Sequence, residues 1–107
     1  MKYMKTLETK PGCIQRALEV LGDKWTPLII RDLSSNPATF SALEASLTGI
    51  SPRTLSQRID MLESEKIIKK ECYCERPPRF EYVLTEKGKD LQKVLSQMAS
   101  WGAKYPV

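Results

Sequence analysis

The stretch from Thr39 to Glu65 most constrains the fold of this chain, because two amphipathic segments follow one another there with only a glycine turn between them. Apolar residues recur at helical spacing in the first segment, at Phe40, Leu43 and Leu47. Gly49 can take the left-handed backbone conformation that ends a helix, and Ile50 is placed to pack beneath the turn. This order predicts a helix-turn-helix over residues 39–65.

The second segment carries the signals of a helix start and of a buried face. Ser51 offers a side-chain oxygen to the first amides, and Pro52 at the first helical position needs no partner for an N–H. Leu55, Ile59 and Leu62 fall at i, i+4 and i+7, which predicts the buried stripe. The polar and basic residues at the start of this helix lie on or beside the other face: Ser51, Arg53, Thr54, Gln57 and Arg58.

The order of charges along this helix favours contact with nucleic acid. Basic and amide side chains come first, and the acids Asp60, Glu63 and Glu65 come only in the later turns. The first turns of a recognition helix contact base edges, while its N–H groups favour nearby phosphate. We therefore expect these five leading residues to read the major groove of double-stranded DNA. The alternative is that Arg53 and Arg58 only solubilise a surface helix.

A β-hairpin is predicted after the second helix. Residues 67–74 are rich in β-branched and aromatic side chains, and residues 80–84 alternate as a second strand does. Two prolines, Pro77 and Pro78, are expected to keep residues 75–79 out of the paired strands. Arg76 and Arg79 flank these prolines, so the pattern predicts a stiff basic tip that contacts the DNA backbone or the minor groove. A tip that is charged only for solubility is the alternative.

Three further helices complete the expected fold. One covers about residues 12–22 and is closed by Gly22, and another starts with Thr26 as its cap and ends before Asn36-Pro37. The last covers about residues 85–103, with Thr85 as its cap. A chain of 107 residues supports one domain with an ordinary core. We predict a mainly α fold with a small β-hairpin wing (α+β): a single winged helix-turn-helix domain over residues 1–107 with additional terminal helices.

The terminal helices carry more apolar surface than a small core absorbs. Their apolar stripes consist of Ile14, Leu18, Leu21, Leu91, Val94, Leu95, Met98 and Trp101. Large exposed apolar patches usually indicate partners, and a two-fold dimer would place two recognition helices about one DNA turn apart. We expect a homodimer joined through these residues. The alternative is that both helices fold back onto their own core.

The composition disfavours an enzyme. Seventeen Lys and Arg residues against thirteen Asp and Glu give a net charge of +4, which suits an anionic partner. The absence of histidine excludes a Ser-His-Asp triad, a Cys-His pair and an HExxH zinc site, so we expect no enzyme, no metal and no cofactor.

The first ten residues lack a secretion signal, and no apolar run reaches membrane-spanning length. We therefore expect a soluble intracellular protein without a membrane partner.

Three cysteines in such a chain predict no structural disulfide framework. Cys13 lies near a helix start, where the helix dipole favours the thiolate and its reaction with oxidants or electrophiles. The alternative for Cys13 is a small buried hydrophobic residue. Cys72 and Cys74 are two apart on a predicted strand, so both thiols are expected on one face. A structural role is expected for this pair, and a soft-metal site with Cys13 is the alternative.

Short motifs recur in a characteristic order over residues 12–103. They are Cys13, Gly22-Asp23-Lys24-Trp25, Gly49-Ile50-Ser51, Leu55-Ser56-Gln57-Arg58, Leu62-Glu63, Pro77-Pro78, Tyr82, Leu84-Thr85-Glu86-Lys87-Gly88 and Trp101-Gly102. Together they resemble the HxlR-type winged helix-turn-helix regulators. The resemblance implies a cytoplasmic homodimeric transcription factor, either a repressor or an activator. It also implies that the position of Cys13 is used in some members to sense oxidants or electrophiles.

Two positions depart from the family pattern, and two other functions stay open. Ile14 follows Cys13 where the family usually has proline, and Thr39 precedes Phe40 where an arginine is common. A winged-helix module that binds only proteins is the main alternative function. A thiol-dependent enzyme that uses Cys13 is the other, although no histidine is present to act as its base.

Overall fold

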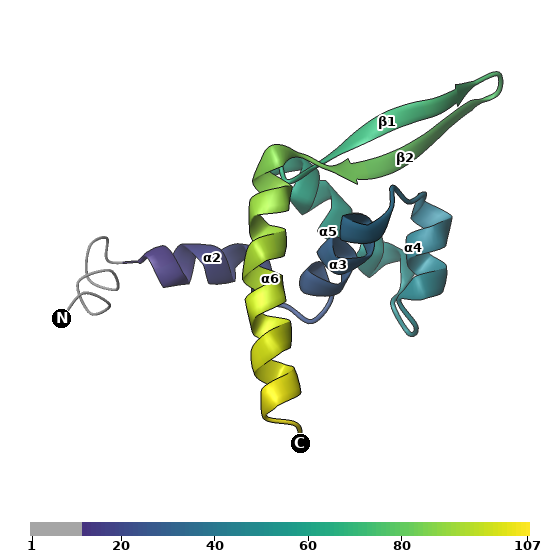
Figure 1. Ribbon diagram of the computed structural model, residues 1–107. Coiled ribbons are helices and arrows are strands. Elements are labelled where there is room, and N and C mark those ends of the chain that lie inside the picture. The colour runs from purple at the N-terminus through teal and green to yellow at the C-terminus, as the bar shows by residue number, and fades with distance from the viewer. Residues whose placement is uncertain (1–11) are drawn as a thin grey trace.

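The computed structural model describes residues 12–107, and this part of the chain forms five helices and one antiparallel hairpin (Figure 1). The elements are α2 (Cys13–Leu21), α3 (Thr26–Ser35), α4 (Phe40–Ser46), α5 (Pro52–Ser64), β1 (Ile68–Glu75), β2 (Pro78–Leu84) and α6 (Glu86–Lys104). The predicted fold class, mainly α with a hairpin wing, is confirmed. The expectation for the first ten residues lies outside the described part. None of the helices between residues 12 and 107 has the length and apolar character needed to span a bilayer.

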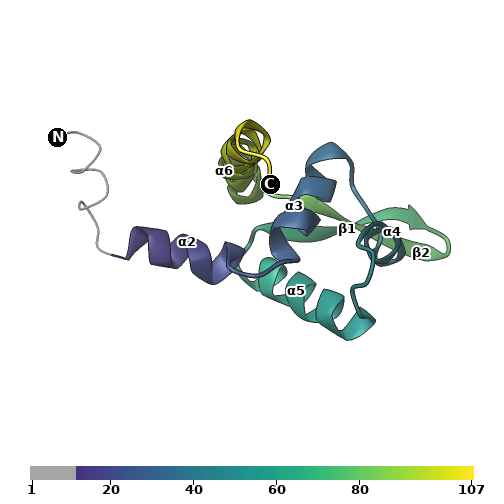
Figure 2. The same ribbon diagram turned by 90° about the horizontal axis from the view of Figure 1, so that it is seen from below.

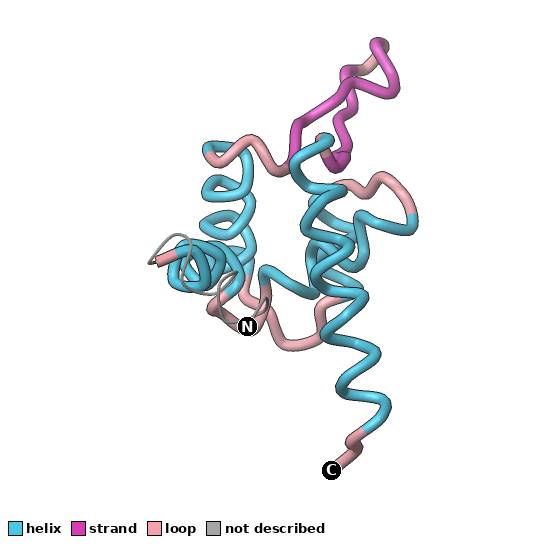
Figure 3. Tube along the Cα trace, turned by 60° about the vertical axis from the view of Figure 1, so that its left-hand side comes forward, coloured by secondary structure: helices cyan, strands magenta, loops and turns pink. Residues whose placement is uncertain are grey.

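The helices α3, α4 and α5 form a central body, and the hairpin and α2 extend from opposite sides of it (Figures 1 and 2). Helix α6 runs between these two extensions, and its last turns extend beyond the other described elements (Figure 3). The hairpin is tied to the body through Ala38, whose N–H and carbonyl both pair with the backbone of Tyr82. This arrangement fixes the root of the wing beside α4 and leaves the wing tip free of the body.

The core is built from the stripe that the sequence predicts for α5. Leu55, Ile59 and Leu62 are each at most 2 % exposed. They pack with buried residues of the other elements: Val20, Ile29, Ile30, Leu33, Leu43, Leu47, Ile50, Ile67, Ile68 and Tyr82. Because α5 buries one whole face here, its opposite face is turned to solvent.

The turn and two of the helix starts also agree with the sequence. Gly49 has a φ of 91°, and Ile50 is buried beneath the turn. The Ser51 hydroxyl accepts a hydrogen bond from the Thr54 N–H at 3.0 Å, which caps α5. The Thr85 hydroxyl accepts one from the Gly88 N–H at 3.2 Å, which caps α6. Local capping chemistry therefore sets both starts.

The start of α3 differs from the prediction that Thr26 caps it. Thr26 is instead the first residue of the helix and is fully buried. The Asp23 carboxylate takes the capping role, because its Oδ1 accepts hydrogen bonds from the N–H groups of Trp25 at 2.8 Å and Thr26 at 2.9 Å. A carboxylate accepts from several donors at once, so it satisfies two orphan amides together.

Two predictions for the hairpin were wrong. Pro78 is the first residue of β2 and pairs in register with Glu75, so only Arg76 and Pro77 form the turn. A proline is tolerated at the first position of a strand. A β-bulge also separates Cys72 from Cys74, which lie opposite Phe80 and Arg79, respectively.

The bulge determines where the two thiols point. Their partners are adjacent residues of β2 and therefore face opposite sides of the hairpin. Cys72 and Cys74 thus do not share a face, because the bulge shifts the alternation by one residue.

Candidate nucleic-acid interface

The exposed face of α5 begins with the residues that the sequence predicts for DNA contact. Ser51, Arg53 and Gln57 are exposed, and Thr54 is half-buried. The Ser51 hydroxyl also donates to Thr54 Oγ1 at 2.9 Å, so these two side chains hold each other at the helix start. Arg53 and Gln57 are one helical turn apart and lie opposite the buried stripe. The start of α5 therefore presents a guanidinium and an amide to solvent on one ridge.

Arg58 is placed differently from Arg53. Its side chain is only 34 % exposed and its Nη1 lies 3.8 Å from Oδ2 of Asp23. The Arg58 Nε is buried, and it has no hydrogen-bond partner within residues 12–107. Burial alone would raise the pKa of Asp23, but hydrogen bonds from Thr26 and Trp25 and the charge of Arg58 together hold it below its ordinary value. Arg58 is therefore directed toward the turn before α3.

The wing supplies a second cationic surface. Arg76 and Arg79 are both exposed at or beside the tip. A cleft of about 490 Å³ lies between the start of α4 and the wing, and it is lined by Thr39, Phe40, Ser41, Lys70, Tyr73, Arg79, Phe80 and Tyr82. Lys70 Nζ lies 5.2 Å from the centre of the Phe80 ring, and Phe80 and Tyr73 are about half exposed.

The sequence prediction did not include Lys70 or Tyr73 among the contact residues. The sequence signal that points to them is the pair of lysines, Lys69 and Lys70, followed by the aromatic Tyr73 on the same strand, since cationic and aromatic side chains are the groups that bind nucleic acids. Cationic, amide and hydroxyl groups thus occur at the start of α5, in the cleft and at the wing tip. Such a set can bind phosphate oxygens and base edges. Within residues 12–107, no three His, Cys, Asp or Glu side chains gather as a metal site would require.

The profile of the HxlR-like helix-turn-helix family matches residues 20–106. The chain belongs to this family. The match runs from the end of α2 through α6 and includes the helix-turn-helix and the wing. The resemblance seen in the sequence is confirmed, and the protein is a transcriptional regulator of the HxlR-like family.

Relatives and solved structures agree with this assignment. The HTH-type transcriptional regulator YvaP of Bacillus subtilis is 36 % identical over 91 residues, which span 85 % of this chain and 84 % of YvaP. The reduced form of the transcriptional regulator YodB from B. subtilis matches with a TM-score of 0.79 and 32 % identity, over 91 % of this chain and 94 % of that one. The redox regulator HypR in its oxidized form matches with a TM-score of 0.80 and 29 % identity, over 88 % and 97 %.

The terminal helices of this HxlR-like protein divide their apolar residues between two environments. Leu21, Leu91 and Leu95 are half-buried and pack against the core. For these three residues the structure agrees with the alternative that the terminal helices fold back onto their own core. The other five expected interface residues are 45–67 % exposed: Ile14, Leu18, Val94, Met98 and Trp101. Val94 also lines a groove of about 290 Å³ between α2 and α6, together with Ile67 and Leu91. The two helices therefore keep an apolar surface that their own core does not cover.

The cysteines of this HxlR-like chain are all free thiols. Cys13 is the first residue of α2 and is exposed, so the alternative that it is a buried hydrophobic residue is wrong. Cys72 is exposed on the wing and its Sγ donates to the carbonyl of Cys74.

Proposed function

We propose that this HxlR-like regulator binds double-stranded DNA sequence-specifically, with α5 in the major groove and the wing on the backbone or in the minor groove. The observation that carries the proposal is the exposed ridge of Arg53 and Gln57 opposite the buried stripe of α5. It is accompanied by the exposed guanidinium groups of Arg76 and Arg79 on the neighbouring wing. A helix start with these groups fits base edges and flanking phosphates.

The proposed contacts divide into two kinds. Arg53, Thr54 and Gln57 contact base edges, because they lie on the exposed side of the first turns. Ser51 lies at the capped helix start, next to a phosphate. Arg58 contributes from the flank, where Asp23 holds its guanidinium. Arg76 and Arg79 bind phosphates and add affinity that does not depend on sequence.

We propose that the functional unit is a homodimer joined through α2 and α6. The exposed side chains of Ile14, Leu18, Val94, Met98 and Trp101 support this proposal, since large apolar side chains exposed in this number on two helices are usually covered by a partner. A two-fold axis between the helices would set two copies of α5 about 34–36 Å apart, one turn of DNA. The preferred operator is then a palindrome.

Selection from random duplexes, followed by a salt titration, tests DNA binding. We expect a palindromic sequence to be enriched, and its affinity to fall with salt at a log–log slope of about −0.9 per phosphate neutralised. No enrichment, or an interaction that is insensitive to salt, would favour the protein-interaction module instead.

Sedimentation of the purified protein tests the dimer. Met98→Asp introduces a charge into the exposed apolar surface of α6 and should shift the protein toward the monomer. Tyr73→Asp is the matched control, because Tyr73 is similarly exposed but lies on the wing. A dimer that survives Met98→Asp unchanged, or a wild type that sediments as a monomer, contradicts the proposed interface.

A thiol response through Cys13 is a second proposal for the same regulator. It is supported by the exposure of Cys13 at the start of α2 and by the similarity to the redox regulator HypR. Operator binding is compared for wild type, Cys13→Ser and the control Cys72→Ser, before and after diamide treatment. Diamide should change binding by wild type and Cys72→Ser but not by Cys13→Ser. Binding that diamide leaves unchanged in all three proteins would exclude the thiol response.

A further inference from the structure

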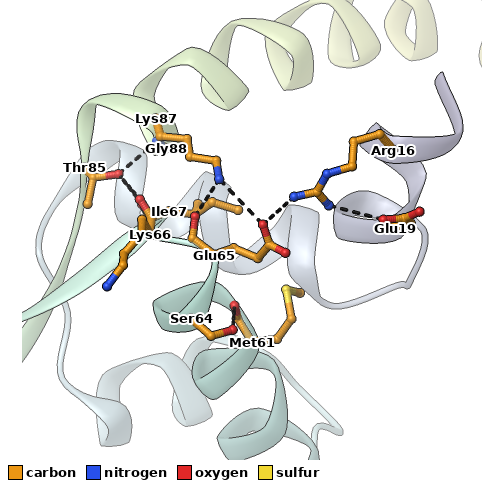
Figure 4. Close-up of polar contacts among 10 residues, drawn as sticks. All are labelled: Arg16, Glu19, Met61, Ser64, Glu65, Lys66, Ile67, Thr85, Lys87 and Gly88. Carbon is orange, nitrogen blue, oxygen red and sulfur yellow. Dashed lines mark hydrogen bonds and ion pairs between the residues drawn. The ribbon is translucent and has the colours of Figure 1, made fainter. Parts of the chain in front are cut away.

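The end of α5 is held to both terminal helices by one carboxylate (Figure 4). Glu65, the C-cap residue of α5, accepts a hydrogen bond at Oε1 from Nη2 of Arg16 on α2 at 2.5 Å. The same oxygen lies 3.5 Å from Nζ of Lys87 on α6. Lys87 Nζ also donates to the backbone carbonyl of Glu65 at 2.7 Å. Three helices that are distant in sequence therefore meet at this side chain.

A carboxylate at this position depends on its cationic partners. The partial negative charge at a helix C-terminus disfavours an acidic side chain there. The hydrogen bond from Arg16 lowers the pKa of Glu65, burial opposes this, and the charges of Arg16 and Lys87 lower it further. The net direction is downward, so Glu65 stays ionised at neutral pH and the two contacts persist there.

Helix α2 has few other contacts that fix its direction. Val20 is its only buried residue, and it lies one turn after Arg16 on the same face. Arg16 also pairs with Glu19, but that pair lies within α2 and does not connect it to another element. Leu21, the last residue of α2, also packs partly against the core. The orientation of α2 relative to α5 therefore depends on the packing of Val20 and Leu21 at its C-terminal end and on the ion pair with Glu65.

Helix α6, by contrast, is fixed to the end of α5 by backbone contacts. The Thr85 N–H donates to the carbonyl of Ile67 at 3.0 Å, and the Thr85 hydroxyl donates to the carbonyl of Lys66. A Cβ on Gly88 would lie 2.3 Å from the Ile67 carbonyl oxygen, so α6 approaches this segment as closely as a glycine allows. Because α5 and α6 are fixed to each other, the angle that can change is the one between α2 and these two helices.

We infer that Glu65 is a positioning residue that sets this angle and thereby the half-site spacing that the dimer accepts. The inference rests on the proposed function, because it assumes that α2 and α6 form the dimer and that α5 reads DNA. In such a dimer, any rotation of α2 against α5 moves one recognition helix relative to the other. A fixed Arg16–Glu65 contact restricts that rotation and so restricts the operator spacings that fit.

The test compares wild type with Glu65→Gln, Arg16→Gln and the control Glu19→Gln. The first readout needs no DNA: hydrogen exchange of the amides of α2. Loss of one partly exposed ion pair should speed this exchange about five-fold in Glu65→Gln and Arg16→Gln. Glu19→Gln removes a charge that also contacts Arg16 but leaves the contact with α5, so its exchange should match wild type.

The second readout is the preference for the selected operator over versions with one base pair added or removed between the half-sites. This preference should fall about five-fold in Glu65→Gln and Arg16→Gln, and stay unchanged in Glu19→Gln. A loss of affinity that is equal at every spacing indicates only a structural role and overturns the inference, as does unchanged exchange of α2. If wild type binds no duplex, the proposed function fails, and the exchange experiment alone decides whether Glu65 positions α2. Arg16→Gln changes an exposed side chain and keeps the test valid if Glu65→Gln does not fold.

Discussion

The Asp23 carboxylate lies 3.8 Å from the guanidinium group of Arg58 and thereby connects the turn before α3 to α5. The same carboxylate accepts hydrogen bonds from the N–H groups of Trp25 and Thr26, and from the Thr26 hydroxyl at 2.6 Å. One side chain thus caps one helix and holds a basic residue of another. Its hydrogen bonds and its charge have separable effects, because asparagine keeps a carbonyl acceptor but not the charge.

Replacement of Asp23 should show the contribution of the cap. Asp23→Ala removes every acceptor, so we expect the free energy of unfolding to fall by about 1 kcal/mol or more. Asp23→Asn keeps an oxygen for the two amides and should lower it less. Urea denaturation of the two variants measures the difference, and equal stability of Asp23→Ala and wild type would show that the carboxylate does not cap α3.

Acidification should weaken the wild type more than Asp23→Asn. The pKa of Asp23 is lowered in the folded protein, so its contribution to stability is present above the unfolded pKa, about 3.9, and is lost as pH falls through the folded pKa. Glu65 has a lowered pKa too, but it is present in both proteins and cancels in the comparison. Thermal unfolding between about pH 5 and pH 2 checks this. Parallel curves for the two proteins would contradict it.

The helix-turn-helix could be predicted from the sequence because its signals are local. The turn residue Gly49, the cap Ser51 and the stripe of α5 lie within a few residues of the structure that they specify. Features set by distant partners were missed for the opposite reason. Arg58 was placed by helical geometry alone, which gives a direction but does not reveal Asp23, 35 residues earlier, as its partner.

The hairpin and the end of α5 show the same limit of local signals. The bulge between Cys72 and Cys74 follows from how β1 pairs with β2, and alternation along one strand does not record that register. From the sequence, Glu65 is identified only as one of the acidic residues in the later turns of the helix, away from the expected DNA phosphates. Its contacts with Arg16 and Lys87 depend on how three helices pack, and no spacing in the chain encodes them.

Lys66→Gly should stabilise the protein. Lys66 follows α5 with a φ of 63°, and its N–H and that of Ile67 return to the carbonyls of Glu63 and Leu62. This is the position at which helices favour glycine, because a left-handed residue with a Cβ is less stable by about 1 kcal/mol. Lys66→Ala removes the same charge but keeps the strained Cβ, so it should not stabilise. Urea denaturation distinguishes the two, and a gain shared by both variants would indicate an effect of charge instead.

Gly88→Ala should destabilise the junction of α6 with the end of α5. The added Cβ would lie 2.3 Å from the Ile67 carbonyl oxygen, a backbone atom that cannot move aside without shifting the chain. Gly102 lies in the same helix with no atom within 4 Å of the corresponding position. Gly102→Ala should therefore raise the melting temperature, because alanine is the better helix former by about 1 kcal/mol. Melting temperatures that move together would show that α6 does not approach Ile67 so closely.

Gln57→Ala and Arg79→Ala should affect DNA binding in different ways, because the first side chain is proposed to contact a base and the second a phosphate. Gln57→Ala should lower discrimination at one base position by about 1–3 kcal/mol. Arg79→Ala should weaken binding to all sequences similarly and reduce the salt slope by about 0.9. The matched controls are Gln92→Ala on α6 and Arg31→Ala on α3, which remove the same groups from exposed positions outside the proposed interface. Binding measured on a panel of operator variants at several salt concentrations separates these effects. Wild-type specificity in Gln57→Ala together with a wild-type slope in Arg79→Ala would place the DNA on a different surface of the molecule.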